Sequence, residues 1–254
     1  FGMGCSIDIN SSGDLYCLIG SPYDLGTTAG AAYLFTSTDN TKTGFTFQRI
    51  TASISVSNDG FGQAVDVKAY TKDQGTKKGV FCLVGDGDNS PRVWLYHSRS
   101  TEPFEIFYGG GENQSCQKKL VPANHSSNAA GYSFGKNHGT LDMTIGTGAE
   151  LGGHGVYCLV GDPYHYNSKG ACWIFGSGSD NNGTSLFQKS FNGHTTTGLP
   201  TFGRSVSIVS GSDSVYCMVG APAYSSPSRG YINLFKSTGD VKHEIKNPVT
   251  INYF

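Results

Sequence analysis

The chain contains one pattern four times, and this repeat constrains its fold more than any other feature of the sequence. Each copy consists of an aromatic residue, a cysteine, two large apolar residues and a glycine, followed by a turn. The four copies are YCLIGSPY at 16–23, FCLVGDGD at 81–88, YCLVGDPY at 157–164 and YCMVGAPA at 216–223. A repeat of this length builds a fold from one kind of unit, so each copy predicts one structural unit.

Three further segments recur around each copy. A Phe-Gly pair precedes it and two apolar runs follow it. The pairs begin at Phe1, Phe61, Phe134 and Phe202, and the runs span 30–35, 92–96, 170–175 and 230–235, then 45–50, 104–108, 185–191 and 249–254. Four segments per unit predict sixteen short strands, joined by turns rich in Gly, Asn, Asp, Ser and Pro. In the third unit, residues 136–155 are interpreted as an insertion between the first two strands.

The composition also favours strands, because only 15% of the residues are charged and 36 are glycine. A four-stranded sheet cannot bury both faces by itself, so successive sheets must stack, and a ring hides the outermost ones. We therefore predict an all-β fold, a four-bladed β-propeller with four antiparallel strands per blade. It forms a single domain, 1–254, with blades near 1–53, 61–109, 134–192 and 202–254.

The Phe-Gly opening and the hydrophobic Gly-Ala/Ser-Pro end of the second strand resemble the FG-GAP repeat of the integrin α-subunit propeller. The fourth unit, with FGRSVSI and VYCMVGAPA, is the most similar, and the resemblance covers the whole chain. It implies an integrin-like propeller that serves cell adhesion or ligand binding through the loops of one face. Relatives often have seven blades, so completion of the ring by another chain remains an alternative.

The same resemblance implies a calcium loop between the first and second strands of a unit. In the first unit, Asp8, Asn10, Ser12 and Asp14 alternate around a glycine. Tyr16 stands where the family places its last carboxylate, and the other units lack the series. These four residues are therefore a weak calcium candidate, with a polar hairpin turn as the alternative. No other cofactor is expected.

Charge and hydropathy restrict the partners. The net charge of −1 gives no basic face for nucleic acid, and no apolar run is long enough for a membrane span. Asn-x-Ser/Thr acceptors for glycosylation occur at Asn10, Asn113, Asn124 and Asn182. We therefore expect a secreted, extracellular glycoprotein whose partner is a glycan, a protein ligand or further copies of itself.

The seven cysteines are an odd number, so at least one is free or pairs between chains in an oxidising compartment. Cys17, Cys82, Cys158 and Cys217 recur at one position of the second strand, where packing as small buried residues is favoured. Disulfide candidates across a hairpin are Cys5 with Cys17 and Cys158 with Cys172. Cys116 has no counterpart and is the candidate for an intermolecular disulfide.

Tyrosines follow the second strand in three units. Tyr23, Tyr164, Tyr166 and Tyr224 lie in the loops before the third strand, which emerge on one rim of a propeller. Aromatic faces beside Asp, Asn and Ser suit a sugar, which needs stacking for its C–H face and hydrogen bonds for its hydroxyls. These residues are the predicted ligand-binding site, although tyrosine serves protein interfaces equally well.

No catalytic residues are predicted, so the protein is expected not to be an enzyme. The G-x-S-x-G match at 131–135 contains the repeat's own Phe134-Gly135 and leads into a strand rather than a helix. His138, Asp142 and His154 fall in the interpreted insertion and are read as a solvated loop. The predicted function is non-enzymatic extracellular binding or adhesion, lectin-like in character. The alternative is a structural subunit of an extracellular filament, coat or matrix.

Overall fold

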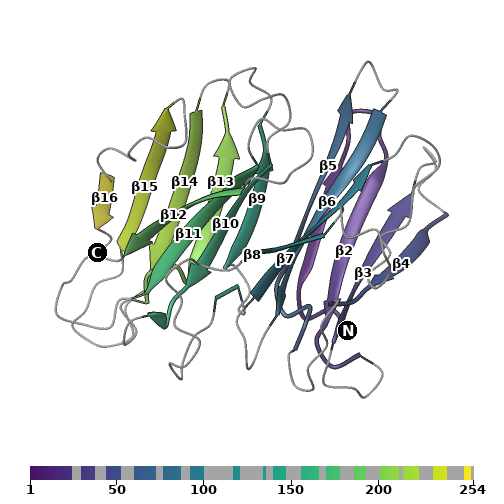
Figure 1. Ribbon diagram of the computed structural model, residues 1–254, viewed down its shortest axis with the longest axis horizontal. Helices are drawn as coiled ribbons and strands as arrows, with labels where there is room; N and C mark the ends of the chain where they lie inside the picture. Colours follow the sequence, from purple (N-terminus) through teal and green to yellow (C-terminus); the bar gives the residue numbers. More distant parts are fainter. Residues whose placement is uncertain are drawn as a thin grey trace. The chain divides into compact units, whose positions relative to one another are not determined.

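A computed structural model describes most of the predicted strands. The described residues are 1–24, 30–37, 44–52, 60–72, 77–86, 92–99, 117–120, 134–135, 140–146, 156–165, 170–177, 186–192, 201–211, 214–222, 231–238 and 249–252. Within them, sixteen strands form four antiparallel sheets of four strands each (Figure 1). The chain divides into two compact units, Phe1–Leu120 and Val121–Phe254, and each contains two of the sheets.

In every sheet the strands follow one another in chain order. The first unit contains β1 (Cys5–Ile9), β2 (Leu15–Ser21), β3 (Ala31–Ser37) and β4 (Thr46–Ile50), then β5 (Val65–Lys72), β6 (Lys77–Asp86), β7 (Arg92–Arg99) and β8 (Gln117–Leu120). The second contains β9 (Leu141–Ile145), β10 (Val156–Asp162), β11 (Ala171–Ser177) and β12 (Leu186–Asn192), then β13 (Ser205–Ser210), β14 (Ser214–Ala221), β15 (Tyr231–Thr238) and β16 (Val249–Asn252). The all-β class and the four-stranded antiparallel unit are thus confirmed.

Two strands differ from the sequence-based assignment. Strand β9 (Leu141–Ile145) lies inside the segment 136–155. This part of the segment is therefore the first strand of the third sheet and not an insertion. Strand β8 pairs with β7 at Gln117–Leu120, whereas the predicted run 104–108 lies outside the described residues. The sequence QKKL gave no apolar signal because an edge strand needs none, and charged residues protect such edges from further pairing.

Each Phe-Gly pair folds back onto the second strand of its own sheet. The Gly2 amide donates to the Gly20 carbonyl at 2.9 Å, and the other three pairs repeat this bond. Their glycines all have positive φ, at 79°, 97°, 64° and 91° for Gly2, Gly62, Gly135 and Gly203. Glycine adopts this left-handed conformation without the steric cost that other residues incur. The recurrence of the pair is thus explained by a shared turn.

In the first unit, the Phe-Gly pair of the second sheet also packs on the first sheet. Gly30 and Phe61 form a parallel β-bridge. A methyl group on Gly20 would collide with the Gly62 carbonyl, and one on Gly62 would collide with the carbonyl oxygen of Ala31. We give the name Phe-Gly docking site to three residues of a sheet. They are the glycine near the end of the second strand and the two residues where the third strand begins. In the first sheet it consists of Gly20, Gly30 and Ala31.

The second unit repeats this contact at equivalent positions. Gly170 and Phe202 form the bridge. A methyl group on Gly161 would collide with the Gly203 carbonyl, and one on Gly203 with the carbonyl oxygen of Ala171. The repeat's glycines are therefore the points at which the backbones of two successive sheets meet, and a side chain of any size would force them apart.

Apolar side chains of both sheets bury the rest of each contact. In the first unit, Phe61 is fully buried and shares a cluster with Tyr16 and Leu18 of the first sheet and Trp94 and Tyr96 of the second. In the second unit the equivalent cluster contains Tyr157, Leu159, Cys172, Ile174, Phe202, Ile208, Val215, Cys217, Val219, Ala221 and Phe235. Each unit thus has a core between its two sheets, and hydrophobic burial there stabilises the contact.

The first strands of two successive sheets are joined by side chains. In the first unit the Val67 amide donates to Ser6 Oγ at 3.2 Å, and the Ala69 amide donates to Asp8 Oδ2 at 2.7 Å. In the second, the Ile208 amide donates to Asp142 Oδ2 at 2.6 Å, and the Ser210 amide to Thr144 Oγ1 at 3.2 Å. These side chains accept hydrogen bonds from amides on the edges of β5 and β13 that face away from their paired strands.

The predicted disulfides across hairpins are wrong, because the registers differ from the assumed ones. Cys5 lies opposite Ile19 and Cys17 opposite Ile7, so the two cysteines are diagonal neighbours beyond the usual disulfide reach. Cys158 lies opposite Phe175, whereas Cys172 lies opposite Gly161, which places the two cysteines on different faces of their sheet. The six described cysteines form no disulfide, and Cys116 lies outside the described residues.

Candidate functional site

Two of the four predicted ligand tyrosines lie in the described residues, at equivalent turns of the first and third sheets. Tyr23 follows β2 and is 63% exposed, and Tyr164 follows β10 and is 38% exposed. Each stands directly after a proline in the turn that leaves the second strand. Tyr166 and Tyr224 lie outside the described residues. The structure therefore places exposed aromatic rings at the end of the second strand in both units.

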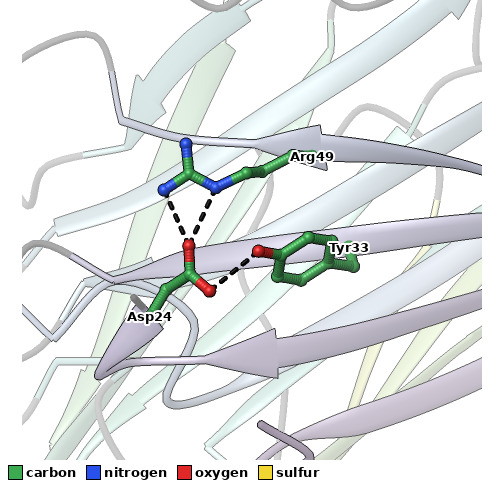
Figure 2. A network of polar contacts seen from close by, with 3 residues as sticks. All are labelled: Asp24, Tyr33 and Arg49. Carbon is green, nitrogen blue, oxygen red and sulfur yellow. Dashed lines mark hydrogen bonds and ion pairs between the residues drawn. The ribbon is translucent and has the colours of Figure 1, made fainter. Parts of the chain in front are cut away.

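Beside Tyr23, three residues from separate parts of the first sheet form a polar network (Figure 2). Asp24 Oδ1 accepts a hydrogen bond of 2.8 Å from the Tyr33 hydroxyl. Asp24 Oδ2 accepts from Arg49 Nε at 2.8 Å and forms an ion pair with Arg49 Nη2 at 2.7 Å. Tyr33 and Arg49 are directly opposed across β3 and β4, which places both donors near one carboxylate. We call these three residues the Asp24 network.

The network fixes the turn that carries Tyr23. Asp24 is buried, whereas the Arg49 side chain is partly exposed. Desolvation by burial and the hydrogen bond to Asp24 raise the pKa of Tyr33. Burial lowers the pKa of Arg49, but its hydrogen bonds with Asp24 and Tyr33 outweigh that effect and raise it. Arg49 is thus a cation and Tyr33 a neutral donor at neutral pH, and both donate to the Asp24 carboxylate.

Aromatic rings surround the Asp24 network on one face of the first sheet. The centroids of Phe1 and Tyr33 are 5.4 Å apart, those of Tyr33 and Phe47 6.4 Å, and those of Phe35 and Phe47 5.8 Å. These separations are typical of favourable aromatic contacts. Phe1 and Phe47 are nevertheless 74% and 67% exposed. The sequence analysis did not find this surface, because it is assembled from Phe1 and two strands, β3 and β4, whose register was unknown.

The third sheet has a buried counterpart of the network. His165 occupies the position of Asp24, and its ring contacts Trp173 edge-on at 5.0 Å between centroids. His165 Nδ1 also lies 3.7 Å from Asp162 Oδ2. In the second sheet, Trp94 Nε1 donates to Asp86 at 3.5 Å. A tie between this turn and the third strand is therefore a general feature of the repeat, and only the first sheet combines it with an exposed tyrosine and an arginine among the described residues.

The calcium candidates are engaged by the protein itself. Asn10 Oδ1 accepts from the amides of Ser12 and Asp14 at 3.0 Å each, and Asn10 Nδ2 donates to Asp14 at 2.8 Å. Asp8 binds the amide of Ala69 on the neighbouring sheet. This is an Asx-type turn, the polar hairpin alternative of the sequence analysis. Among the described residues, no group of three or more His, Cys, Asp or Glu side chains is placed to hold a metal ion.

The glycosylation prediction for Asn10 is wrong in this fold. Its side chain is 5% exposed, and Nδ2, the atom that would carry the glycan, is bonded to Asp14. The other acceptors, Asn113, Asn124 and Asn182, lie outside the described residues, as do His138 and His154. Asp142, read earlier as part of a solvated loop, lies in strand β9 and bonds to the next sheet. Within the described parts of the chain, no helix has the length and apolar character needed to cross a membrane.

No protein-family model matches the chain, and no curated protein matches it either. The solved structures that match most of the chain's length include the following two. A GH43 endo-arabinanase from Bacillus licheniformis has 14% identity and a TM-score of 0.41, and the match covers 92% of this chain and 71% of the arabinanase. A tail fiber of Staphylococcus aureus phage P68 has 11% identity and a TM-score of 0.26, and the match covers 98% of this chain and 63% of the fiber.

Proposed function

We propose that the protein is a non-enzymatic extracellular binding protein that takes a saccharide at the tyrosine-bearing turns. In this proposal the four sheets are four blades of a β-propeller, and the turns after the second strands lie on its binding face. The observation that carries the proposal is Tyr23, an exposed ring on a turn that the buried Asp24 holds in place. A fixed aromatic face costs little entropy on binding, which favours it as a contact for a ligand.

The surroundings of Tyr23 supply the polar contacts that a sugar needs. Arg49 is partly exposed and has donors left beyond its two contacts with Asp24, since a guanidinium group carries five N–H bonds. Aromatic stacking on the C–H face of a pyranose, with hydrogen bonds to its hydroxyls, is the usual basis of such binding. Asp24 holds Tyr33 and Arg49 in place, because its oxygens accept hydrogen bonds from both.

A glycan array tests this proposal, with wild-type protein, Tyr23→Ala and Tyr164→Ala compared on the same array. We expect binding to one class of sugar and a loss of about tenfold or more in each variant, since a lost stacking contact of about 1.4 kcal/mol corresponds to that factor. Phe45→Ala is the matched control, because it removes another exposed aromatic ring from the first sheet. No sugar bound by the wild type, or an equal loss in Phe45→Ala, would contradict the proposal.

A second candidate is a structural subunit of an extracellular assembly. The observation that favours it is the exposure of large apolar side chains on two sheets rather than at scattered points. Phe1, Ile7 and Ile9 are exposed on the first sheet, and Met218 and Leu234 on the fourth. Contiguous apolar surfaces of this kind mark protein interaction sites on soluble proteins.

A further inference from the structure

The guanidinium group of Arg49 uses only one of its edges to hold Asp24. Its Nε and Nη2 both approach Asp24 Oδ2, at 2.8 Å and 2.7 Å, so the carboxylate occupies the edge that these two nitrogens share. A guanidinium group has five N–H bonds in one plane, and two of them are directed at Asp24. Figure 2 shows the third nitrogen, Nη1, pointing away from the carboxylate. The edge formed by Nη1 and Nη2 therefore has two further N–H bonds to donate beyond Asp24.

This guanidinium group lies at the turn that carries Tyr23. Strand β2 ends at Ser21, and Tyr23 and Asp24 are neighbours in the turn that follows it. The ion pair with Asp24 therefore places the cation beside this turn. Asp24 is buried, whereas the Arg49 side chain is 41% exposed. All of these residues belong to the first unit, so a ligand that stacks on Tyr23 has a fixed positive charge at the same turn.

The third sheet shows that holding the turn does not require an arginine. There the matching turn is tied to the third strand by the ring contact of His165 with Trp173. By register, Trp173 occupies the position of Tyr33. Ser190 lies opposite Trp173, at the position that Arg49 occupies opposite Tyr33 in the first sheet. The third sheet thus has no cation at this position, and Arg49 adds a charge that the tie between turn and strand does not need.

The chemistry of the second edge favours a carboxylate as its acceptor. Two parallel N–H bonds of a guanidinium group match the two oxygens of a carboxylate, and each such charge-assisted bond is about twice as strong as a bond between neutral groups. A sugar hydroxyl has a single oxygen and no charge, so it uses less of what this edge offers. Asp24 sits on the edge shared by Nε and Nη2, so the guanidinium group would lie between the two carboxylates and reduce their repulsion.

We infer that the ligand of this turn is an acidic saccharide, whose pyranose ring stacks on Tyr23 while its carboxylate pairs with the Nη1 and Nη2 edge of Arg49. This inference rests on the proposed function, because it names the class of sugar for that same site and makes Arg49 its specificity-determining residue. Asp24 and Tyr33 are positioning residues, which hold the guanidinium group and the turn in place.

A glycan array that pairs each uronic acid oligosaccharide with its methyl ester tests the inference, because the ester keeps the pyranose ring and removes the charge. We expect the wild type to bind an acid about tenfold or more tightly than its ester. Arg49→Gln should lose this preference. Arg49→Lys should keep only part of it, because an ammonium group supplies the charge without the planar pair of N–H bonds. Added salt should weaken the preference of the wild type.

Tyr33→Phe is the matched control, because it removes the other hydrogen bond to Asp24 and leaves Arg49 in place. The ratio of acid to ester binding in this variant should equal that of the wild type, even where both affinities fall. If Arg49 only held the turn, Arg49→Gln would weaken acid and ester equally, and that result would overturn the inference. Wild-type binding of sugars without preference for the acid would also overturn it and leave the proposed function standing. If the wild type bound no sugar, the proposed function would fail and this inference with it.

Discussion

At the scale of single residues, the polar side chains of the first strands are structural. Asp8 and Asp142 each accept a hydrogen bond from a backbone amide of the next sheet. Hydrogen bonds to a charged acceptor contribute about 1.5–3 kcal/mol to stability, more than those between neutral groups. Asp8, a calcium candidate in the sequence, therefore has a role in joining sheets, and so does Asp142.

Asp142→Ala should destabilise the second unit. Its Oδ2 accepts from the Ile208 amide and from the Ser207 hydroxyl, and its Oδ1 accepts from the Met143 amide. Removal of the Asp142 carboxylate leaves these three donors without their acceptor. We therefore expect a loss of about 1–3 kcal/mol in the free energy of unfolding. Urea denaturation provides the measurement. Val209→Ala, an exposed change on the neighbouring strand, should stay within about 0.5 kcal/mol of the wild type, and an equal effect of both changes would be evidence against the assignment.

The buried cysteines Cys172 and Cys217 should be unreactive in the folded protein. Desolvation by burial raises the pKa of the Cys217 thiol to about 12 and that of Cys172 well above its ordinary value. Only the thiolate is nucleophilic, so alkylation by iodoacetamide near neutral pH should modify Cys5, which is exposed, and spare Cys172 and Cys217. Peptide mapping by mass spectrometry distinguishes the sites. Equal labelling of Cys5, Cys172 and Cys217 in the native protein would contradict the burial of the latter two.

The same burial makes stability depend on pH in the alkaline range. In the unfolded chain these thiols ionise near the ordinary value of 9.0, but in the folded protein they keep their protons. Above that value the unfolded state binds fewer protons, so the free energy of unfolding falls as the pH rises. For Cys217 the fall should extend to a pH of about 12. Thermal unfolding at stepped pH should show a smaller alkaline loss in Cys217→Ala than in the wild type; an unchanged slope would contradict this origin.

At the scale of elements, the repeated glycines decide how closely two sheets approach. Gly161 lies against the Gly203 carbonyl with no room for a methyl group, and the obstacle is backbone rather than a movable side chain. Such a contact has to be relieved by moving a whole strand away from its neighbour. Because protein cores are close-packed, that displacement would open the apolar cluster on both sides of the contact.

Gly161→Ala should therefore lower the free energy of unfolding by more than an ordinary surface change, by about 1–3 kcal/mol or more. Gly211→Ala is the control in the same unit, because its nearest neighbours lie at ordinary contact distances of 3.5 Å and 3.6 Å. Calorimetric unfolding of the two variants checks this. Equal stabilities would mean that the sheets do not meet at Gly161.

The repeat alone was sufficient to predict most strands, because each unit carries its own apolar pattern. The register was not predictable. The β1–β2 hairpin has its turn at Asn10–Asp14, and for this reason Cys17 lies opposite Ile7 and not opposite Cys5. The Asp24 network depends on that same kind of information, since Tyr33 and Arg49 meet only across paired strands. Strand β9 was missed because Leu141, Met143 and Ile145 alternate within a glycine-rich stretch that was read as a loop.

At the scale of the whole molecule, the chain consists of two units with the same internal contact. Each unit joins two sheets by a Phe-Gly pair, an apolar cluster and two side chains that bind amides of the neighbouring edge. The repeated Phe-Gly pair therefore describes how the two sheets of a unit are joined. The proposed binding site lies in the turns that follow the second strands.

Amide hydrogen exchange tests this joint most directly. The amides of Val67, Ala69, Ile208 and Ser210 lie on strand edges and donate only to side chains of the preceding sheet. Buried hydrogen-bonded amides of a core exchange near the rate of global unfolding, whereas those of an open edge exchange freely. We predict that all four amides are protected and that Asp142→Ala selectively accelerates exchange at Ile208. Exchange of the four at the rate of an open strand edge would show that the sheets are not joined in this way.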